Sequence, residues 1–123
     1  MAGSRAIDRW LEAYEAAWAS GSGVSDLFSP DARYFTAPFQ PPIVGPDAIE
    51  RWWISQGESG TRWTFEREVI AIDGLLHVGQ GRTTYPDTIG PAGEPQVYYN
   101  LWLITLLDSG RASEFVEYWM LPQ

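Results

Sequence analysis

The spacing of apolar residues changes once along this chain, near Thr61. Before Thr61 apolar side chains recur about every 3.6 residues, as on one face of an amphipathic helix. After it they follow the two-residue repeat of a half-buried strand. The sequence therefore predicts an α+β fold, with two helices in the first half and a curved sheet in the second.

Two principal helices are predicted. The first has one apolar stripe and ends at the Gly- and Ser-rich residues 19–23; the stripe consists of Ile7, Trp10, Leu11, Tyr14 and Trp18. Pro46 begins the second helix, over 47–56. Between the helices we expect a helical turn at 25–28, a brief strand at Tyr34 and Phe35, and an irregular, proline-rich connection over 36–46.

The second half predicts a four-strand antiparallel meander. The expected strands cover 61–72, 75–85, 97–107 and 112–121. Asp73-Gly74 is a strong two-residue hairpin signal between the first two strands. A loop is expected at 86–96, and Ser109-Gly110 is expected to turn the second hairpin.

Composition limits the chemistry. The 123 residues predict one domain, 1–123, and the net charge of −8 argues against nucleic acid or an anionic membrane as the main partner. The chain contains no Cys, no Lys and only one His, His77, so thiol, Schiff-base and paired-His metal chemistry are excluded. No apolar run is long enough to span a bilayer, and the N-terminus becomes charged too early for a signal peptide. A cytoplasmic protein without metal or cofactor is expected.

Four segments, in order, resemble the SnoaL-like group of the nuclear-transport-factor-two-like superfamily. They are the AxxYxxAWxxG-like run ending at Gly21, then LFSPDARYF, then GPDAIERWW, and then the terminal meander. The resemblance implies a cone-shaped, curved antiparallel sheet wrapped around the N-terminal helix, with an apolar pocket inside. Relatives include ketosteroid isomerases, polyketide cyclases, epoxide hydrolases and domains without chemistry, so the resemblance is specific for fold rather than for activity.

Hairpin geometry predicts which residues share a face of the last strand, and the family resemblance implies which of the two faces lines the cone. If Asp108 pairs with Arg111, then Trp102 lies opposite Glu117, and Phe115 and Trp119 share the face of Glu117. Glu114, on the other face, is then the solvent residue. That outer face is also apolar and predicts a homodimer; it carries Leu101, Leu103, Val116 and Tyr118.

The resemblance assigns roles to three residues. Tyr14 and Asn100 match the positions of the oxyanion-hole groups of ketosteroid isomerases, whose general base, however, falls near Thr36. Glu117 matches an acid of limonene-type epoxide hydrolases. Arg82 stands where their arginine falls, but Thr84 replaces their aspartate. The two alignments turn opposite faces of strand 75–85 inward, and two glycines there are interpreted as a possible bulge.

These inferences give a candidate site. Glu117, Tyr14 and Asn100 are the candidate catalytic groups, with Glu117 moving the proton; desolvation would raise the pKa of its carboxyl. The candidate substrate-binding residues are Trp18, Trp53, Trp102, Phe115, Trp119, Arg82 and His77. Simpler interpretations stay open: Tyr14 as core, His77 as structural, and Glu117 as a paired carboxylate at a dimer edge.

Two functions follow from this site. The leading hypothesis is a cofactor-free acid-base enzyme that isomerises, cyclises, dehydrates or opens the epoxide of a small apolar organic molecule. The alternative is a non-catalytic module of the same fold that binds a small ligand or only dimerises.

Overall fold

The computed structural model describes residues 2–37, 39–56, 63–90 and 93–120. Two α-helices, one 3-10 helix and six strands follow one another along the chain. Their order and bounds are α1 Ala2–Ser20, η1 Val24–Leu27, β1 Phe28–Phe35, β2 Ile43–Val44, α2 Pro46–Gln56, β3 Thr64–Asp73, β4 Leu76–Ile89, β5 Pro95–Leu106 and β6 Ala112–Met120. The predicted change from helices to strands is confirmed.

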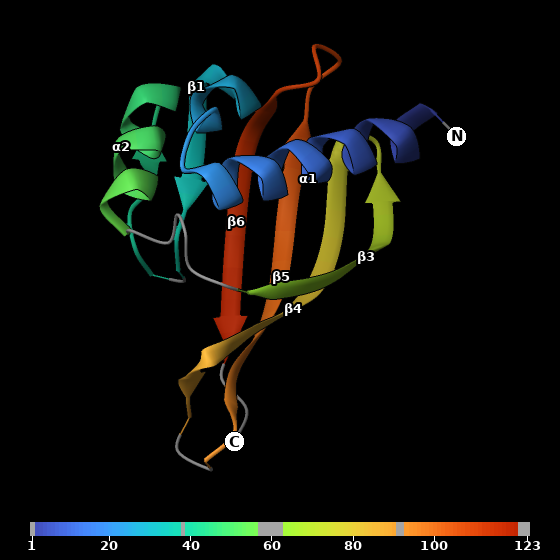
Figure 1. Cartoon of the computed structure of the whole chain (residues 1–123). Helices are drawn as coiled ribbons and strands as arrows, with labels where there is room; N and C mark the ends of the chain where they lie inside the picture. The colour runs from blue at the N-terminus through green and yellow to red at the C-terminus, as the bar shows by residue number, and fades with distance from the viewer. Residues whose placement is uncertain (1, 38, 57–62, 91–92, 121–123) are drawn as a thin grey trace.

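The six strands form one open, curved sheet in the order β2-β1-β6-β5-β4-β3. Strands β3 to β6 make the predicted antiparallel meander. Figure 1 shows α1 lying across the hollow side of this sheet, with α2 beside the β1 end. The α+β cone with a central helix is therefore the observed fold.

The sheet is mixed rather than purely antiparallel, which corrects the prediction. Strand β1 pairs parallel with β6, including Tyr34 with Phe115, and antiparallel with the short β2. Strand β1 is also longer than the brief strand expected, and β2 lies inside the segment expected to be irregular. A parallel pairing joins segments far apart in sequence, so no local turn signal predicts it.

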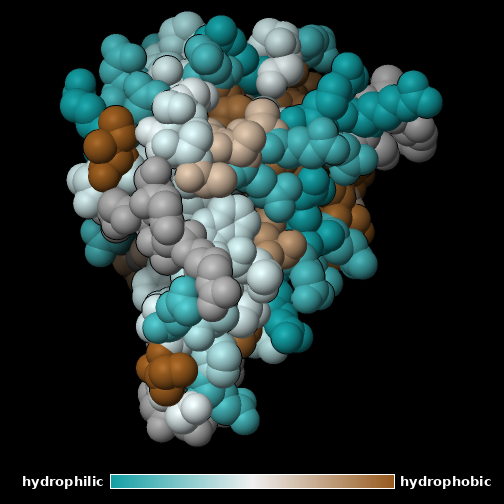
Figure 2. All heavy atoms as spheres, viewed as in Figure 1, coloured by the Kyte–Doolittle hydropathy of each residue, from teal (hydrophilic) through white to brown (hydrophobic). Residues whose placement is uncertain are grey.

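The core forms where the apolar stripe of α1 meets the sheet. Trp10 stacks on Phe115 of β6 with ring centroids 5.7 Å apart, and its indole Nε1 donates to the Leu27 carbonyl at 2.9 Å. Tyr34 of β1 also stacks on Phe115, with ring centroids 5.0 Å apart. These aromatic contacts fix the height of α1 above β6. On the solvent side of α1 most residues are hydrophilic, and hydrophobic residues appear as separate groups (Figure 2).

The register of β5 and β6 agrees with the prediction, although the turn does not. Trp102 pairs with Glu117, and Asn100 pairs with Trp119. The turn, however, closes between Leu107 and Arg111, where the Leu107 N–H donates to the Arg111 carbonyl at 2.9 Å. A bulge after Thr105 restores the predicted pairing. The extra turn residue and the bulge cancel, so the face of Glu117 is as expected.

The hairpin between β3 and β4 differs from the prediction by one residue. Asp73 pairs with Leu76, so the two turn residues are Gly74 and Leu75, with Gly74 at a φ of 59°. A bulge at Ile70 shifts the rest of β3. Strand β4 also continues to Ile89 and β5 begins at Pro95, so much of the expected 86–96 loop is strand.

None of the described helices has the length and apolar character needed to cross a membrane.

Candidate active site

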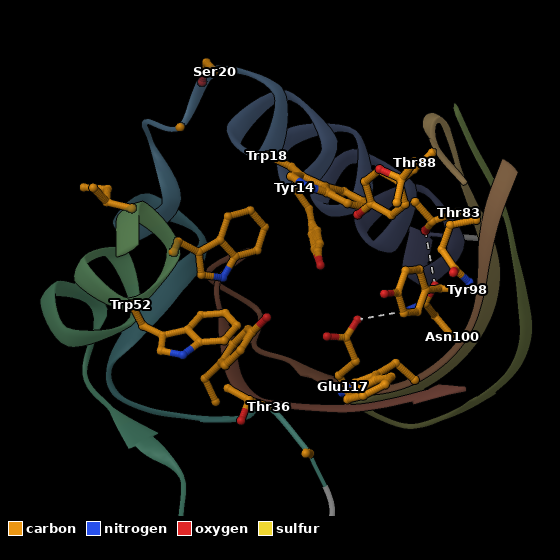
Figure 3. A pocket seen from close by; sticks show the side chains of 18 residues that line it. Tyr14, Trp18, Ser20, Thr36, Trp52, Thr83, Thr88, Tyr98, Asn100 and Glu117 are labelled. Carbon is orange, nitrogen blue, oxygen red and sulfur yellow. Dashed lines mark hydrogen bonds between the residues drawn. The ribbon is translucent and has the colours of Figure 1, made fainter. Parts of the chain in front are cut away.

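A cavity of about 780 Å³ opens between α1, α2 and the hollow face of the sheet. Its volume is in the range of pockets that hold small organic molecules. Helix α1 supplies Tyr14 and Trp18, and α2 supplies Trp52 and Trp53. The sheet contributes the polar side chains, and Figure 3 shows several of them pointing into the same space: Thr36, Thr83, Tyr98, Asn100 and Glu117.

Glu117 is the carboxylate of this cavity. The indole Nε1 of Trp102 donates to its Oε2 at 3.0 Å, and the amide Nδ2 of Asn100 donates to the same oxygen at 3.2 Å. Pairing of β5 with β6 sets this geometry, because it places Trp102 directly opposite Glu117. Both donated bonds favour the carboxylate over the carboxylic acid.

Thr83 fixes the direction of the Asn100 amide. The Thr83 hydroxyl donates to Asn100 Oδ1 at 3.2 Å, which leaves Nδ2 to face Glu117 (Figure 3). The result is a chain of donors from β4 through β5 to β6. Asn100 therefore helps to hold the Glu117 carboxylate in place.

Two glycines of β4 make room for the indole that supports Glu117. A Cβ added at Gly81 would lie 2.5 Å from Cη2 of Trp102, and one at Gly79 would lie 3.2 Å from its Cε3. Strand β4 pairs with β5 without a shift from Leu76 to Tyr85, so the glycines mark no bulge between these strands. The space they leave is filled by Trp102 and not by a ligand. The inward face of β4 is the one with Gly79, Gly81 and Thr83.

Tyr14 projects from α1 toward the sheet, and its hydroxyl points into the cavity above Glu117 (Figure 3). Its ring is held by stacking on Phe115 at 5.5 Å and by an edge contact with Trp53 at 5.1 Å. Tyr14 is thus a core residue whose polar end reaches the pocket, which joins the two interpretations that the sequence left open.

The other predicted binding residues divide into two groups. Trp18, Trp53 and Trp119 line the cavity. Trp102 and Phe115 are buried behind its wall, so they shape the site without facing it.

Arg82 and His77, two of the predicted binding residues, are not among the described residues that line the cavity. Arg82 is exposed on the outer face of β4, where it stands opposite Glu66 of β3 and Tyr99 of β5 in the strand register. His77 is buried, and its Nδ1 lies 2.8 Å from the Leu75 carbonyl. Because a carbonyl only accepts, Nδ1 carries the proton in this contact.

Sequence reasoning missed several lining residues. Thr83 became identifiable only once the inward face of β4 was known. Tyr85, Thr88 and Gln96 belong to the strand extensions that were expected to be a loop. Tyr34 and Trp52 had a signal, since both are aromatic residues of predicted elements, but the β1–β6 pairing that brings them to the site had none.

Metal chemistry has no visible ligand set in the described ranges. Across residues 2–37, 39–56, 63–90 and 93–120, no three His, Cys, Asp or Glu side chains come together as a metal site would require.

The sequence that builds this cavity also matches a protein-family model. The model of the SnoaL-like domain matches residues 7–115. The chain belongs to the SnoaL-like domain family. The match runs from the first core residue of α1 to Phe115 of β6, so it includes most of the cavity wall. Among curated proteins, no sequence matches this chain.

Solved structures share the fold of this SnoaL-like domain at low identity. One is SalBIII, described as an epoxide hydrolase/cyclase-like enzyme in pyran ring formation in the polyether salinomycin; its TM-score is 0.71 at 12% identity, with 96% of this chain and 90% of that chain covered. An NTF-2 like protein of unknown function from Burkholderia xenovorans LB400 has a TM-score of 0.70 at 19% identity, with 98% of this chain and 87% of that chain covered. A ketosteroid isomerase-like protein from Erwinia carotovora atroseptica SCRI1043 has a TM-score of 0.66 at 22% identity, with 96% of each chain covered.

Proposed function

We propose that this SnoaL-like domain is a cofactor-free acid-base enzyme in which Glu117 accepts a proton from a small, largely apolar organic molecule. The observation that carries the proposal is the carboxylate itself, held by two N–H donors on the wall of an aromatic cavity. A carboxylate positioned beside a substrate can act as a general base, and such a group contributes roughly 10²–10⁴-fold to a rate.

The surrounding residues have defined roles in this proposal. Trp102 and Asn100 hold Glu117 at one oxygen, and Thr83 keeps the Asn100 amide in the orientation that donates. In this proposal the Tyr14 hydroxyl donates to an oxygen of the substrate as negative charge develops there. The aromatic walls exclude water and hold a flat molecule. Isomerisation, cyclisation, dehydration and epoxide opening all fit such a site, as the cyclase-like and isomerase-like fold neighbours illustrate.

A nitrobenzisoxazole tests the base directly. This flat, neutral molecule loses its ring C–H proton to a base as its N–O bond breaks, and the product is a coloured nitrocyanophenolate. We expect the protein to accelerate the reaction by about 10²-fold or more over the same concentration of acetate. Glu117→Gln should abolish that acceleration, because the amide keeps the shape of the side chain but cannot take the proton.

Glu114→Gln is the matched control. Glu114 lies on the same strand but faces outward, where it forms an ion pair with Arg33 of β1. This variant should retain the full rate. If the wild-type protein is no faster than acetate, or if Glu117→Gln is as fast as wild type, the domain is better described as the non-catalytic binding module.

A further inference from the structure

The cavity has two walls of different chemistry. The helices contribute the indole faces of Trp18, Trp52 and Trp53. The sheet contributes hydroxyls and amides, and Figure 3 shows Thr83 and Asn100 on the side of the cavity opposite Trp52. A molecule held between these walls meets flat apolar surfaces on one side and neutral polar groups on the other.

The polar side chains of the sheet wall follow the register of β4 and β5. Thr83 stands opposite Tyr98, and the next inward-facing residues of β5 on either side of Tyr98 are Asn100 and Gln96. Inward-facing neighbours along and across two paired strands lie within reach of one another. These four side chains therefore form one continuous group, which we call the polar row: Asn100, Thr83, Tyr98 and Gln96. The row begins beside Glu117, to which Asn100 donates, and runs outward along β5.

The polar row offers both donors and acceptors to a ligand. Thr83 uses its hydroxyl hydrogen on Asn100 Oδ1 and keeps lone pairs for a second partner. Gln96 donates one amide N–H to the Val97 carbonyl at 3.2 Å, which leaves its second N–H and its Oε1. The Tyr98 hydroxyl can both donate and accept. A ligand hydroxyl, which also donates and accepts, complements this row better than an ether oxygen, which only accepts.

Tyr98 is the central member of the row, and contacts with other strands hold its ring. It makes edge contacts with Tyr85 of β4 at 5.8 Å and with Trp119 of β6 at 6.0 Å. A ring held in this way presents its hydroxyl at one place, so little side-chain freedom is lost when a ligand binds. Tyr98 is therefore the member of the row best suited to orient a bound molecule.

We infer that the molecule bound in this cavity carries hydroxyl groups along one edge of a flat apolar body. This inference rests on the proposed function and names the polar part of its substrate. The hydroxylated edge pairs with the polar row, the indoles cover the apolar face, and the reacting C–H lies at the Glu117 end of the row. An analogue without hydroxyls leaves the row unpaired, and a site built to bond a hydroxyl discriminates against the analogue that lacks it.

Three naphthyl ethers test the inference by calorimetry on the full chain. The diol 3-(2-naphthyloxy)propane-1,2-diol donates and accepts, its di-O-methyl ether only accepts, and 2-propoxynaphthalene has the same body without the added oxygens. We expect the diol to bind about tenfold or more tightly than 2-propoxynaphthalene, although water solvates the diol better, and the di-O-methyl ether to gain no such advantage. If either hydroxyl-free probe binds as tightly as the diol, or if none of the three binds, the inference is wrong. These wild-type affinities decide it even if a variant fails to fold.

Tyr98→Phe and Tyr99→Phe separate the contribution of the polar row. Each removes one phenolic hydroxyl from β5, but Tyr99 is 44% exposed and is not among the described residues that line the cavity. Tyr98→Phe should weaken binding of the diol by about three- to tenfold and leave 2-propoxynaphthalene unchanged, and Tyr99→Phe should change neither. Full preference for the diol in Tyr98→Phe would overturn the inference. Diol preference without turnover of the nitrobenzisoxazole would remove the proposed enzyme alone, and turnover without diol preference would remove this inference alone.

Discussion

Trp102 is the residue on which the site depends, although it does not face the cavity. Only 2% of its surface is exposed, yet its Nε1 donates to the Glu117 carboxylate, the proposed base. Its six-membered ring lies over two β4 positions: at Gly81 an added Cβ would collide with the ring, and at Gly79 it would make a tight contact. Two glycines on β4 and one indole on β5 thus set the position of an acid on β6.

Gly81→Ala should therefore destabilise the fold more than Gly79→Ala. The added methyl at Gly81 would lie 2.5 Å from Trp102 and 3.1 Å from both Phe65 and the Glu66 carbonyl, whereas at Gly79 the nearest atom is 3.2 Å away. Forcing a methyl into a packed core costs about 1–3 kcal/mol, so we expect that loss at Gly81 and a smaller one at Gly79. Urea denaturation measures both. Equal stabilities for the two variants would mean that Trp102 moves aside without cost.

The strands differ in how well their neighbours protect them. Strands β5 and β6 lie in the middle of the sheet, with hydrogen-bonded partners on both sides, whereas β3 is an edge and β2 is a two-residue edge. The bulge at Ile70 interrupts β3 at this edge, a feature that discourages pairing with another chain. The acid and its supporting indole therefore lie on the two most enclosed strands.

Amide hydrogen exchange should reflect this order. The slowest amides should be those of β5 and β6 around Trp102 and Glu117, because their exchange requires the sheet to open from within. Amides of β2 and the outer edge of β3 should exchange first. Faster exchange in β5 than in β3 would contradict the strand order.

The elements also show what sequence reasoning reached and where it stopped. Helices with a clear apolar stripe, and the face of Glu117, were predicted correctly, because periodicity and cross-strand pairing are local. The turns at Gly74 and Gly110 were each misplaced slightly, since bulges at Ile70 and Thr105 change the residue count without changing the apolar alternation. The inward face of β4 and the parallel β1–β6 pairing required the structure, because both depend on contacts between distant segments.

At the scale of the whole molecule, the sheet has an outer face that no helix in the described ranges covers. Leu103 pairs with Val116 there, and Leu101 pairs with Tyr118. All four side chains are only half-buried. Arg33 and Glu114 form an ion pair on the same face of β6. An apolar centre with a charged pair beside it has the composition of an interface core and rim.

We expect this face to join two copies of the chain, so sedimentation at micromolar concentration should give a dimer mass. Leu103→Glu places a charge at the centre of the face and should yield monomers, because two glutamates would meet across a symmetric interface. The cavity lies on the other side of the sheet, so the monomer should keep its benzisoxazole activity. Thr105→Glu, on the same face nearer the hairpin turn, is the control. A wild-type monomer at these concentrations would refute the expectation.

The bond between Trp102 and Glu117 has an optical consequence. The emission of an indole depends on the charge and hydrogen bonding at its Nε1, and here the acceptor is the very oxygen of the proposed base. A change in the protonation of Glu117, or a ligand binding beside it, should therefore alter the fluorescence of this buried indole. Trp102 is thus an intrinsic fluorophore hydrogen-bonded to the proposed base. With the other tryptophans replaced by phenylalanine, light emitted by Trp102 would report occupancy of the cavity without any added label.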